Sequence, residues 1–204
     1  MNDYSIKEVQ TLASRAAKGA YMPWGLAEEA AAAVCWLEQN QITAIQPFVD
    51  LLLANEGGDV TRLPAACPVL TGAYLSDLRG TNLSGDPLKI SSLSSPILLV
   101  PFLVWVANDL QRPLRVRWGQ VQVHVGGEGV EIVSGTGYLN AATPQDVEIT
   151  FAPEQPKLSG EKIARIVISD MNSLELERLV RRTHLPESEQ SQASGAGGGR
   201  VDDD

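Results

Sequence analysis

The opening part of the chain has the hydrophobic spacing of a helix. Ser5 and Glu8 form a capping-box pattern, in which each residue caps the backbone of the other. Apolar side chains then recur every three or four positions, which predicts a helix over about 6–18. Gly19 follows as the expected stop.

Two more helices are predicted in the first quarter of the chain. Pro23 stands where a first helical position is expected, and the alanine-rich run after it predicts a second helix that extends to about Gln39. A third helix is predicted over 47–54, and it ends at the breaker residues 55–58.

The pattern is less regular over 59–95, where proline, glycine, serine and threonine recur. We expect mostly loop there, with one short helix over 72–79. Ser95 and Pro96 then resemble an N-cap and a first helical position. They favour a helix over 97–110, although the isoleucine, valine and phenylalanine residues of this run also suit a strand.

Strand periodicity begins in the second half of the chain. Apolar and polar residues alternate over 114–118 and again over 121–125, but the apolar parity switches at Gly119. A parity switch at a glycine indicates either a bulge or a bend between two strands. The glycine-rich turn over 126–129 then leads into 130–133, which predicts a hairpin.

Two further strands are predicted over 146–151 and 164–169, and a closing helix over 174–183. Helices first and hairpin-linked strands after them favour an α+β fold over a doubly wound parallel sheet. We expect a single α+β domain over 1–186, with an N-terminal helical segment and a C-terminal helix packed on a mainly antiparallel sheet. A glycine-rich acidic tail over 187–204 follows it.

The tail has too few apolar residues to build a core. It contains one large apolar side chain, Val201, against five acids and four glycines, so burial cannot offset the entropy that ordering would cost. One arginine against five acids gives it a net charge of −4, out of −9 for the chain. Alone the tail should be mobile. The alternative is an arm that closes over a site or docks on a partner.

Composition excludes several classes of protein. Apolar residues make up 44% of the chain and charged residues 20%, as in ordinary globular proteins. The net charge of −9 disfavours a nucleic-acid partner, because binding to a phosphate backbone depends on lysine and arginine. The first residues lack the pattern of a signal peptide, so we expect a cytoplasmic protein. The longest apolar run, 97–107, is too short to span a bilayer, so we expect no membrane association.

The sequence offers little for metal or cofactor chemistry. It has two histidines and two widely separated cysteines, Cys35 and Cys67, so we expect neither a disulfide nor a transition-metal site. Motifs for phosphate loops, dinucleotide binding and a nucleophile elbow are absent. We therefore expect no cofactor.

One candidate pair for acid–base chemistry lies in the predicted hairpin. If residue 125 pairs with residue 130, His124 faces Glu131, and the two could hydrogen-bond or share a proton. A histidine oriented by a carboxylate suits a general acid or base. An exposed cross-strand pair without a catalytic role explains the same residues, and no nucleophile is identifiable beside them.

Arginines cluster at the end of the last predicted helix. Arg178, Arg181 and Arg182 share one face at helical spacing, where they suit the negative end of the helix dipole. They could also bind an anionic ligand or the acidic tail a few residues further on. A solvated helix end is the simpler alternative.

Trp24, Glu28 and Glu29 mark the start of the second predicted helix. Acids in a first turn suit the helix dipole, which alone accounts for them. Alternatively, the aromatic face and the two carboxylates line a pocket for a cationic or polar small molecule.

Two segments resemble a bacterial family of unknown function. RAAKGAYMPWGLAEEAAAAVCWL (15–37) and RTHLPESEQSQASGAGGGRVDDD (182–204) are similar to the opening and closing segments of the domain of unknown function 3726 family. In the first, a Lys-Gly-Ala element that begins at Lys18 precedes Trp-Gly-Leu-Ala-Glu-Glu-Ala over 24–30. The resemblance implies a bacterial, cytoplasmic, metabolic protein and similarity over essentially the whole chain. It implies no reaction, but it favours a functional role for the tail.

These features predict a small-molecule-binding or partner-binding accessory protein of bacterial metabolism. The candidate ligand-binding residues come from two helix ends, and they are Lys18, Trp24, Glu28, Glu29, Arg178, Arg181 and Arg182. One alternative is a small metal-independent enzyme, a hydrolase or lyase, that uses His124 with Glu131, or Glu28 with Glu29, as acid and base. Another is a structural subunit of a larger enzyme.

Overall fold

The computed structural model describes residues 2–56, 58, 66–81, 83, 86–127, 129–141, 143–157 and 160–183. The predicted tail over 187–204 lies outside the described residues.

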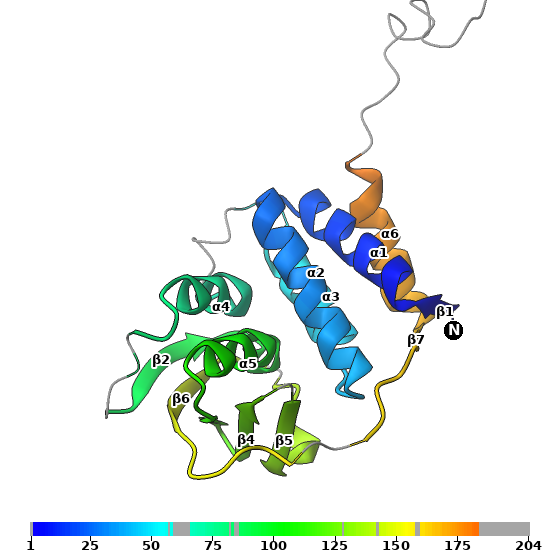
Figure 1. Cartoon of the computed structure of the whole chain (residues 1–204). Helices are drawn as coiled ribbons and strands as arrows, with labels where there is room; N and C mark the ends of the chain where they lie inside the picture. Colours follow the sequence, from blue (N-terminus) through cyan, green and yellow to red (C-terminus); the bar gives the residue numbers. More distant parts are fainter. Residues whose placement is uncertain are drawn as a thin grey trace, which may run out of the picture.

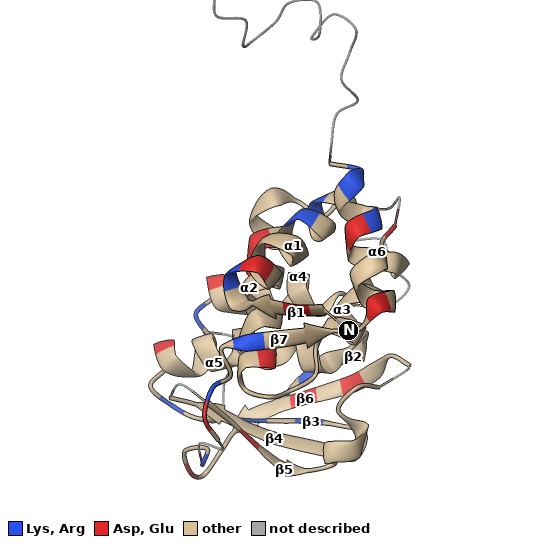
Figure 2. Cartoon of the chain, turned by 90° about the vertical axis from the view of Figure 1, so that its right-hand side faces the viewer, with Lys and Arg blue, Asp and Glu red and all other residues tan. Residues whose placement is uncertain are grey.

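Helices and strands occupy two tiers (Figure 1 and Figure 2). The upper tier holds α1 (Ile6–Gly19), α2 (Trp24–Gln39), α3 (Ile45–Ala54) and α6 (Asp170–Arg181). The lower tier is a sheet; α5 (Val100–Asp109) packs against two of its strands, and α4 (Pro68–Asp77) packs against α5 and α2. This arrangement is the α+β fold that the sequence predicts. Among the described residues, no helix combines the length and the apolar character needed to cross a bilayer.

The five-stranded sheet is antiparallel at every pair of neighbouring strands, in the order β2-β6-β3-β4-β5. The strands are β2 (Leu88–Leu93), β3 (Leu114–Trp118), β4 (Val121–Gly126), β5 (Gly129–Ser134) and β6 (Gln145–Phe151). A separate two-stranded ribbon pairs β1 (Asn2–Ser5) with β7 (Arg165–Ile168). Two 3-10 turns, η2 (Pro96–Leu99) and η3 (Thr136–Tyr138), complete the regular elements.

The parity switch at Gly119 marks a hairpin between β3 and β4. Trp118 pairs with Val121 across a two-residue turn, and Gly119 has a φ of +48°, in the left-handed region that glycine enters readily. The turn keeps the apolar side chains of both strands on the face that packs against α5. Of the two alternatives for Gly119, the structure confirms the bend between two strands and not the bulge. The next hairpin pairs Val125 with Val130, as predicted.

The first helix begins as its sequence predicts. The Glu8 N–H donates to the Ser5 hydroxyl at 3.3 Å, and the Ser5 N–H donates to the Glu8 carboxylate at 2.7 Å. This capping box satisfies two backbone donors at the start of α1. The Ser5 hydroxyl also donates to the Glu8 carboxylate at 2.7 Å, and this bond, followed by the one from the Ser5 N–H, holds the pKa of Glu8 below its ordinary value.

Other boundaries differ from the sequence prediction. α4 and α6 each begin four residues earlier than expected. Pro68 occupies the first turn of α4, and Ser169 caps α6 by accepting a hydrogen bond from the Asn172 N–H at 3.2 Å. Ser95, expected to cap the next helix, makes no cap hydrogen bond and has a φ of +40°, and η2 precedes α5.

Two strands were not predicted, and one predicted strand pairs elsewhere. β1 has only four residues, and the alternation in β2 breaks at Ser92, where φ is +54° and the register shifts. β7 forms where a strand is predicted, but it pairs with β1 and stays outside the five-stranded sheet. A strand that is very short, or whose alternation is interrupted, shows no clear hydrophobic period of two, so its sequence does not predict it.

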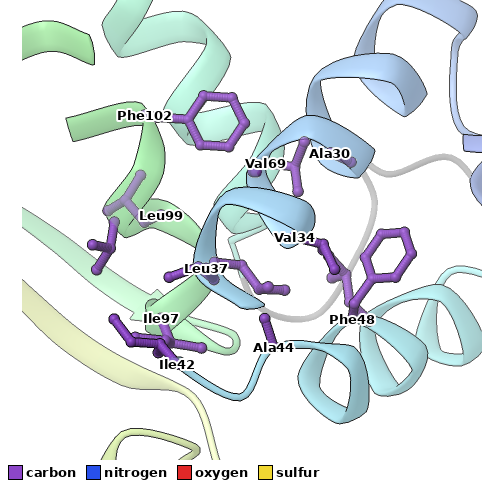
Figure 3. Close-up of a cluster of buried hydrophobic side chains, with 14 of the residues drawn as sticks. Ala30, Val34, Leu37, Ile42, Ala44, Phe48, Val69, Ile97, Leu99 and Phe102 are labelled. Carbon is purple, nitrogen blue, oxygen red and sulfur yellow. The ribbon is translucent and has the colours of Figure 1, made fainter. Parts of the chain in front are cut away.

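α2 lies at the centre of the helical tier. Many of its buried side chains are alanines, which let α1, α3, α4 and α5 pack against it. Figure 3 shows part of this packing, with labelled side chains Ala30, Val34, Leu37, Ile42, Ala44, Phe48, Val69, Ile97, Leu99 and Phe102. The buried apolar side chains of both tiers form one continuous cluster.

α1 and α6 approach each other backbone to backbone at Gly19. A Cβ at this position would lie 2.6 Å from the Leu179 carbonyl carbon and closer still to its oxygen. No side chain fits between the two backbones, because both contacts are far inside van der Waals distance. Gly19 therefore sets the spacing of α1 and α6 in addition to ending α1.

We expect Gly19→Ala to lower the free energy of unfolding by about 2 kcal/mol or more, because the added methyl group overpacks a contact between two backbones. Gly25→Ala is the matched control. Gly25 also lies in a helix, but among the described residues no atom outside its chain neighbours and the backbone of its own helix lies within 4 Å of its Cβ position. Alanine there should be neutral or slightly stabilising. Urea unfolding measures both variants, and equal losses would contradict the close approach.

Candidate functional site

A cleft of about 470 Å³ lies where α1 ends, α2 begins and α6 ends. Residues at or near these three helix ends line it. They are Arg15, Lys18 and Gly19 of α1, Tyr21 and Trp24 at the connection to α2, and Arg182 and Thr183 at the end of α6. The cleft is thus formed by two segments that lie far apart in the sequence.

The charged residues among these are all basic. They are Arg15, Lys18 and Arg182, and Figure 2 shows basic positions in α1 and at the end of α6, at the top of the view. The Lys18 ammonium lies 4.1 Å from the centre of the Trp24 ring and 3.2 Å from a Glu28 carboxylate oxygen. These two contacts hold the Lys18 side chain at the cleft.

Two large aromatic side chains stand open to solvent at the cleft. Tyr21 is 63% exposed and Trp24 is 75% exposed. Aromatic residues usually bury much of their surface, so two exposed rings at one cleft are an informative exception.

The backbone conformation of Tyr21 gives no reason for a tyrosine at this position. Tyr21 has a φ of +66° and ends α1 in a Schellman motif, where glycine is the usual residue. Its N–H donates to the Lys18 carbonyl, and the Met22 N–H donates to the Ala17 carbonyl, both at 3.0 Å. Gln41 ends α2 in the same way, with a φ of +60°. A glycine would serve this turn at least as well, so the ring itself is the feature to explain.

Glu56 joins the end of α3 to α6 beside the cleft. Arg178 donates two hydrogen bonds of 2.8 Å to its carboxylate, and Arg182 donates a third. The bonds from Arg178, followed by those from Arg182, lower the pKa of Glu56 to about 2. Bonding to Glu56 and then to Glu175 raises the pKa of Arg178. This clamp holds Arg182 at the cleft.

The neighbouring residue, Asn55, ties the same end of α3 to α1. Asn55 is 1% exposed, and its side-chain amide donates to the Ala20 carbonyl at 2.8 Å. Residues 55 and 56 therefore fasten the end of α3 to the ends of α1 and α6, two of the three helices that form the cleft.

The structure unites residues that the sequence placed in two separate groups. Lys18 and Trp24 from one group line the same cleft as Arg182 from the other. Glu28 flanks the cleft through its ion pair with Lys18. Arg178 supports it through the shared carboxylate of Glu56.

Two other candidates lie apart from this arrangement. The Arg181 side chain is 77% exposed and lies 3.9 Å from Glu177, on its own helix. Partial burial raises the pKa of Glu29, and the negative charge of Asp77 at the end of α4 adds to this. Glu28 and Glu29 thus have different neighbours and do not converge on one site.

Sequence reasoning missed three residues of the site: Arg15, Tyr21 and Glu56. Arg15 lies three positions before Lys18 in α1, so the i, i+3 spacing was a usable signal. Glu56 carried no such signal, because its partners lie more than 120 residues away in the sequence.

His124 and Glu131 face each other in the β4–β5 pair, as the predicted register requires. Each has another polar neighbour. The Glu131 carboxylate accepts a hydrogen bond from the Lys157 N–H at 3.1 Å, and His124 Nε2 lies 3.4 Å from the Gln122 amide nitrogen. The acid–base role of this pair stays a prediction.

Both cysteines are buried free thiols. Burial raises the pKa of Cys67 and raises that of Cys35 to about 12. A thiol this hard to ionise is a poor nucleophile at neutral pH. In the part of the chain that the structure describes, no group of three or more histidine, cysteine, aspartate or glutamate side chains could hold a metal ion.

A smaller cleft, of about 310 Å³, lies at the β3–β4 turn, and Trp118, Tyr138 and Gln145 are among its lining residues. The Trp118 indole N–H is buried without a hydrogen-bond partner among the described residues. The described lining of this cleft contains no charged side chain.

Comparison with known families bears on the first of these clefts. Residues 4–66 match the family model described as Protein of unknown function (DUF3726). The match confirms the resemblance at the N-terminal end. It includes Arg15, Lys18, Tyr21 and Trp24, whereas Arg182 lies outside it. No curated protein and no solved structure matches the chain. The DUF3726 match thus covers one wall of the cleft and names no activity for it.

We expect Glu56→Gln to lower the free energy of unfolding at pH 7 and the loss to disappear in acid. The pKa of Glu56 in the folded protein, about 2, lies below the ordinary value of 4.5. The ionised carboxylate therefore stabilises the fold above about pH 4.5, and this contribution is lost as the pH falls toward 2.

Urea unfolding at pH 7, at pH 4 and near pH 2 checks this prediction. Glu177→Gln is the control, because its carboxylate lies 3.9 Å from an exposed arginine and its loss should cost little. A deficit in Glu56→Gln that stays constant across the pH range would contradict the clamp.

Proposed function

We propose that the protein binds a small anionic molecule in the cleft between α1, α2 and α6. The observation that carries the proposal is the chemistry of the lining. Its charged side chains, Arg15, Lys18 and Arg182, are all basic, and they lie beside two exposed aromatic rings. Basic side chains suit carboxylate or phosphate groups, and the rings suit a flat apolar part of the same molecule.

The contacts of Lys18 favour an anion over a cation. A cationic ligand would use the face of Trp24 and the carboxylate of Glu28. The Lys18 ammonium already lies between them, at 4.1 Å and 3.2 Å. A second cation would have to displace it or lie beside it, against the repulsion of Lys18 and its basic neighbours.

Hydrogen bonds within the protein also hold parts of the cleft lining in place. The Glu56 clamp holds the Arg182 side chain, and the Schellman turn fixes the backbone at Tyr21, by hydrogen bonds that do not involve a ligand. Side chains that are held in place before binding lose less entropy when a ligand arrives.

A protein partner is the second candidate, and the exposure of Trp24 favours it. Tryptophan, tyrosine and arginine contribute most of the binding energy in many protein interfaces. The same lining would then hold an acidic segment of the partner. We place either role in the cytoplasm of a bacterium, as an accessory to metabolism, which accords with two free thiols in a reducing compartment.

Thermal unfolding of the full chain against matched anions and cations tests the proposal. We expect a carboxylate or phosphate compound to raise the melting temperature, since about 100 times its dissociation constant adds about 2.7 kcal/mol of stability. A cationic analogue of the same shape should give no shift. Absence of any shift by the anions, with capture of an acidic protein segment instead, would move the function to the second candidate.

Tyr21→Gly separates binding from stability. Glycine accepts the left-handed backbone of this turn, so the variant should keep its stability within about 1 kcal/mol while it loses most of the ligand-induced shift. Gln41→Gly makes the same change in the same motif, at the far end of α2, roughly 24 Å away along a 16-residue helix. It should keep the full shift, and equal shifts in the two variants would contradict the proposed site.

A further inference from the structure

We infer that the acidic tail of this chain, residues 187–204, is itself an occupant of the cleft and competes there with other anions. The inference uses the same cleft as the proposed function but does not depend on it, because a tail can dock whether or not a small molecule also binds.

The described chain ends at the cleft. Thr183, the last described residue, lines it, and 21 residues follow. Glu187 comes only four residues later, which is within about 14 Å even for extended backbone. A chain of about 20 glycine- and serine-rich residues spans roughly 25 Å on average, so Asp204 can also return to the cleft.

The charges of tail and cleft are complementary. The tail carries five acids against one arginine, whereas the charged residues that line the cleft are all basic. The glycines at 195 and 197–199 have no side chains, so this part of the tail can lie close against the Tyr21 and Trp24 rings.

The sequence suggested Arg178, Arg181 and Arg182 as the docking position of the tail, but the first two do not line the cleft. The Arg178 guanidinium is held by Glu56 and Glu175, and Arg181 pairs with Glu177 on its own helix. Arg182 gives one of its five N–H donors to Glu56 and also lines the cleft. We therefore place the tail acids on the Arg182 and Lys18 side.

Because the tail belongs to the same chain as the cleft, even a weakly binding tail would occupy the cleft for much of the time. A short flexible tether gives an effective concentration of about 1 mM. A tail that binds the cleft with a dissociation constant of about 0.1 mM would then be docked about 90% of the time and would weaken a competing anion about tenfold.

The test uses the full-length chain and a variant in which all five tail acids are neutralised, with Glu187→Gln, Glu189→Gln, Asp202→Asn, Asp203→Asn and Asp204→Asn. NMR relaxation of the tail amides and the indole N–H resonance of Trp24 are measured at low salt. We expect neutralisation to make the tail amides more mobile and to shift the Trp24 resonance, because the tail leaves the cleft.

The basic side of the contact is tested in the same way. Lys18→Gln should also release the tail. Lys89→Gln is the matched control, since it makes the same change at an exposed lysine of β2, in the sheet tier, and it should leave the tail amides as they are in the natural chain.

The outcomes are distinct. Tail mobility that is the same in the natural chain, the neutralised chain and Lys18→Gln, with a Trp24 resonance that neutralising the tail leaves unchanged, would overturn the inference and leave the proposed function standing. Effects that weaken on dilution would also overturn it, because the tail would then occupy the cleft of a second copy. A tail that docks, in a protein that no small anion stabilises even after the five tail acids are neutralised, would overturn the proposed function alone.

Discussion

The cleft depends on the contact between α1 and α6 at Gly19. Because the Leu179 backbone fills the space of a side chain there, the two helices end against each other. The basic residues that each carries near its end, Lys18 and Arg182, therefore line one cleft. Basic residues also suit the negative end of a helix dipole. Charges that stabilise two separate helix ends in this way come to line one cleft once a glycine lets the helices pack together.

The polar residues at the end of α3 keep this arrangement in place. Asn55 holds the last turn of α1 and Glu56 holds the last turns of α6, so three helix ends share one network of hydrogen bonds. Below it, buried alanines let neighbouring helices pack around α2. The apolar interior supplies the stability, and the polar network fixes the helix ends on which the cleft depends.

Local patterns predicted local structure well. The capping box of Ser5, the bend between two strands at Gly119, which was one of two alternatives, and the pairing of His124 with Glu131 each depend on a few consecutive residues, and the structure confirms all three. The cleft depends on contacts between segments some 160 residues apart. The hydrophobic periodicity of a sequence does not indicate contacts between such distant segments. The breaker residues after α3 predict the end of a helix, and α3 does end there. Nothing in the same pattern indicates that Glu56, one of these residues, bonds to α6. Sequence reasoning named Lys18, Trp24 and Arg182 as candidates, but it could not show that they line one cleft.

The pairing of the two ends of the described chain has a consequence for biosynthesis. β1 pairs with β7, and α1 packs on α6, so the first and last described elements complete each other. On the ribosome the wall of the cleft that α1 and α2 supply emerges first, and it is completed only after α6 has been made. A polypeptide released before α6 would expose the apolar face of α1 and have half a cleft. The cleft is therefore formed only after synthesis has passed α6 and the two ends of the described chain have packed together.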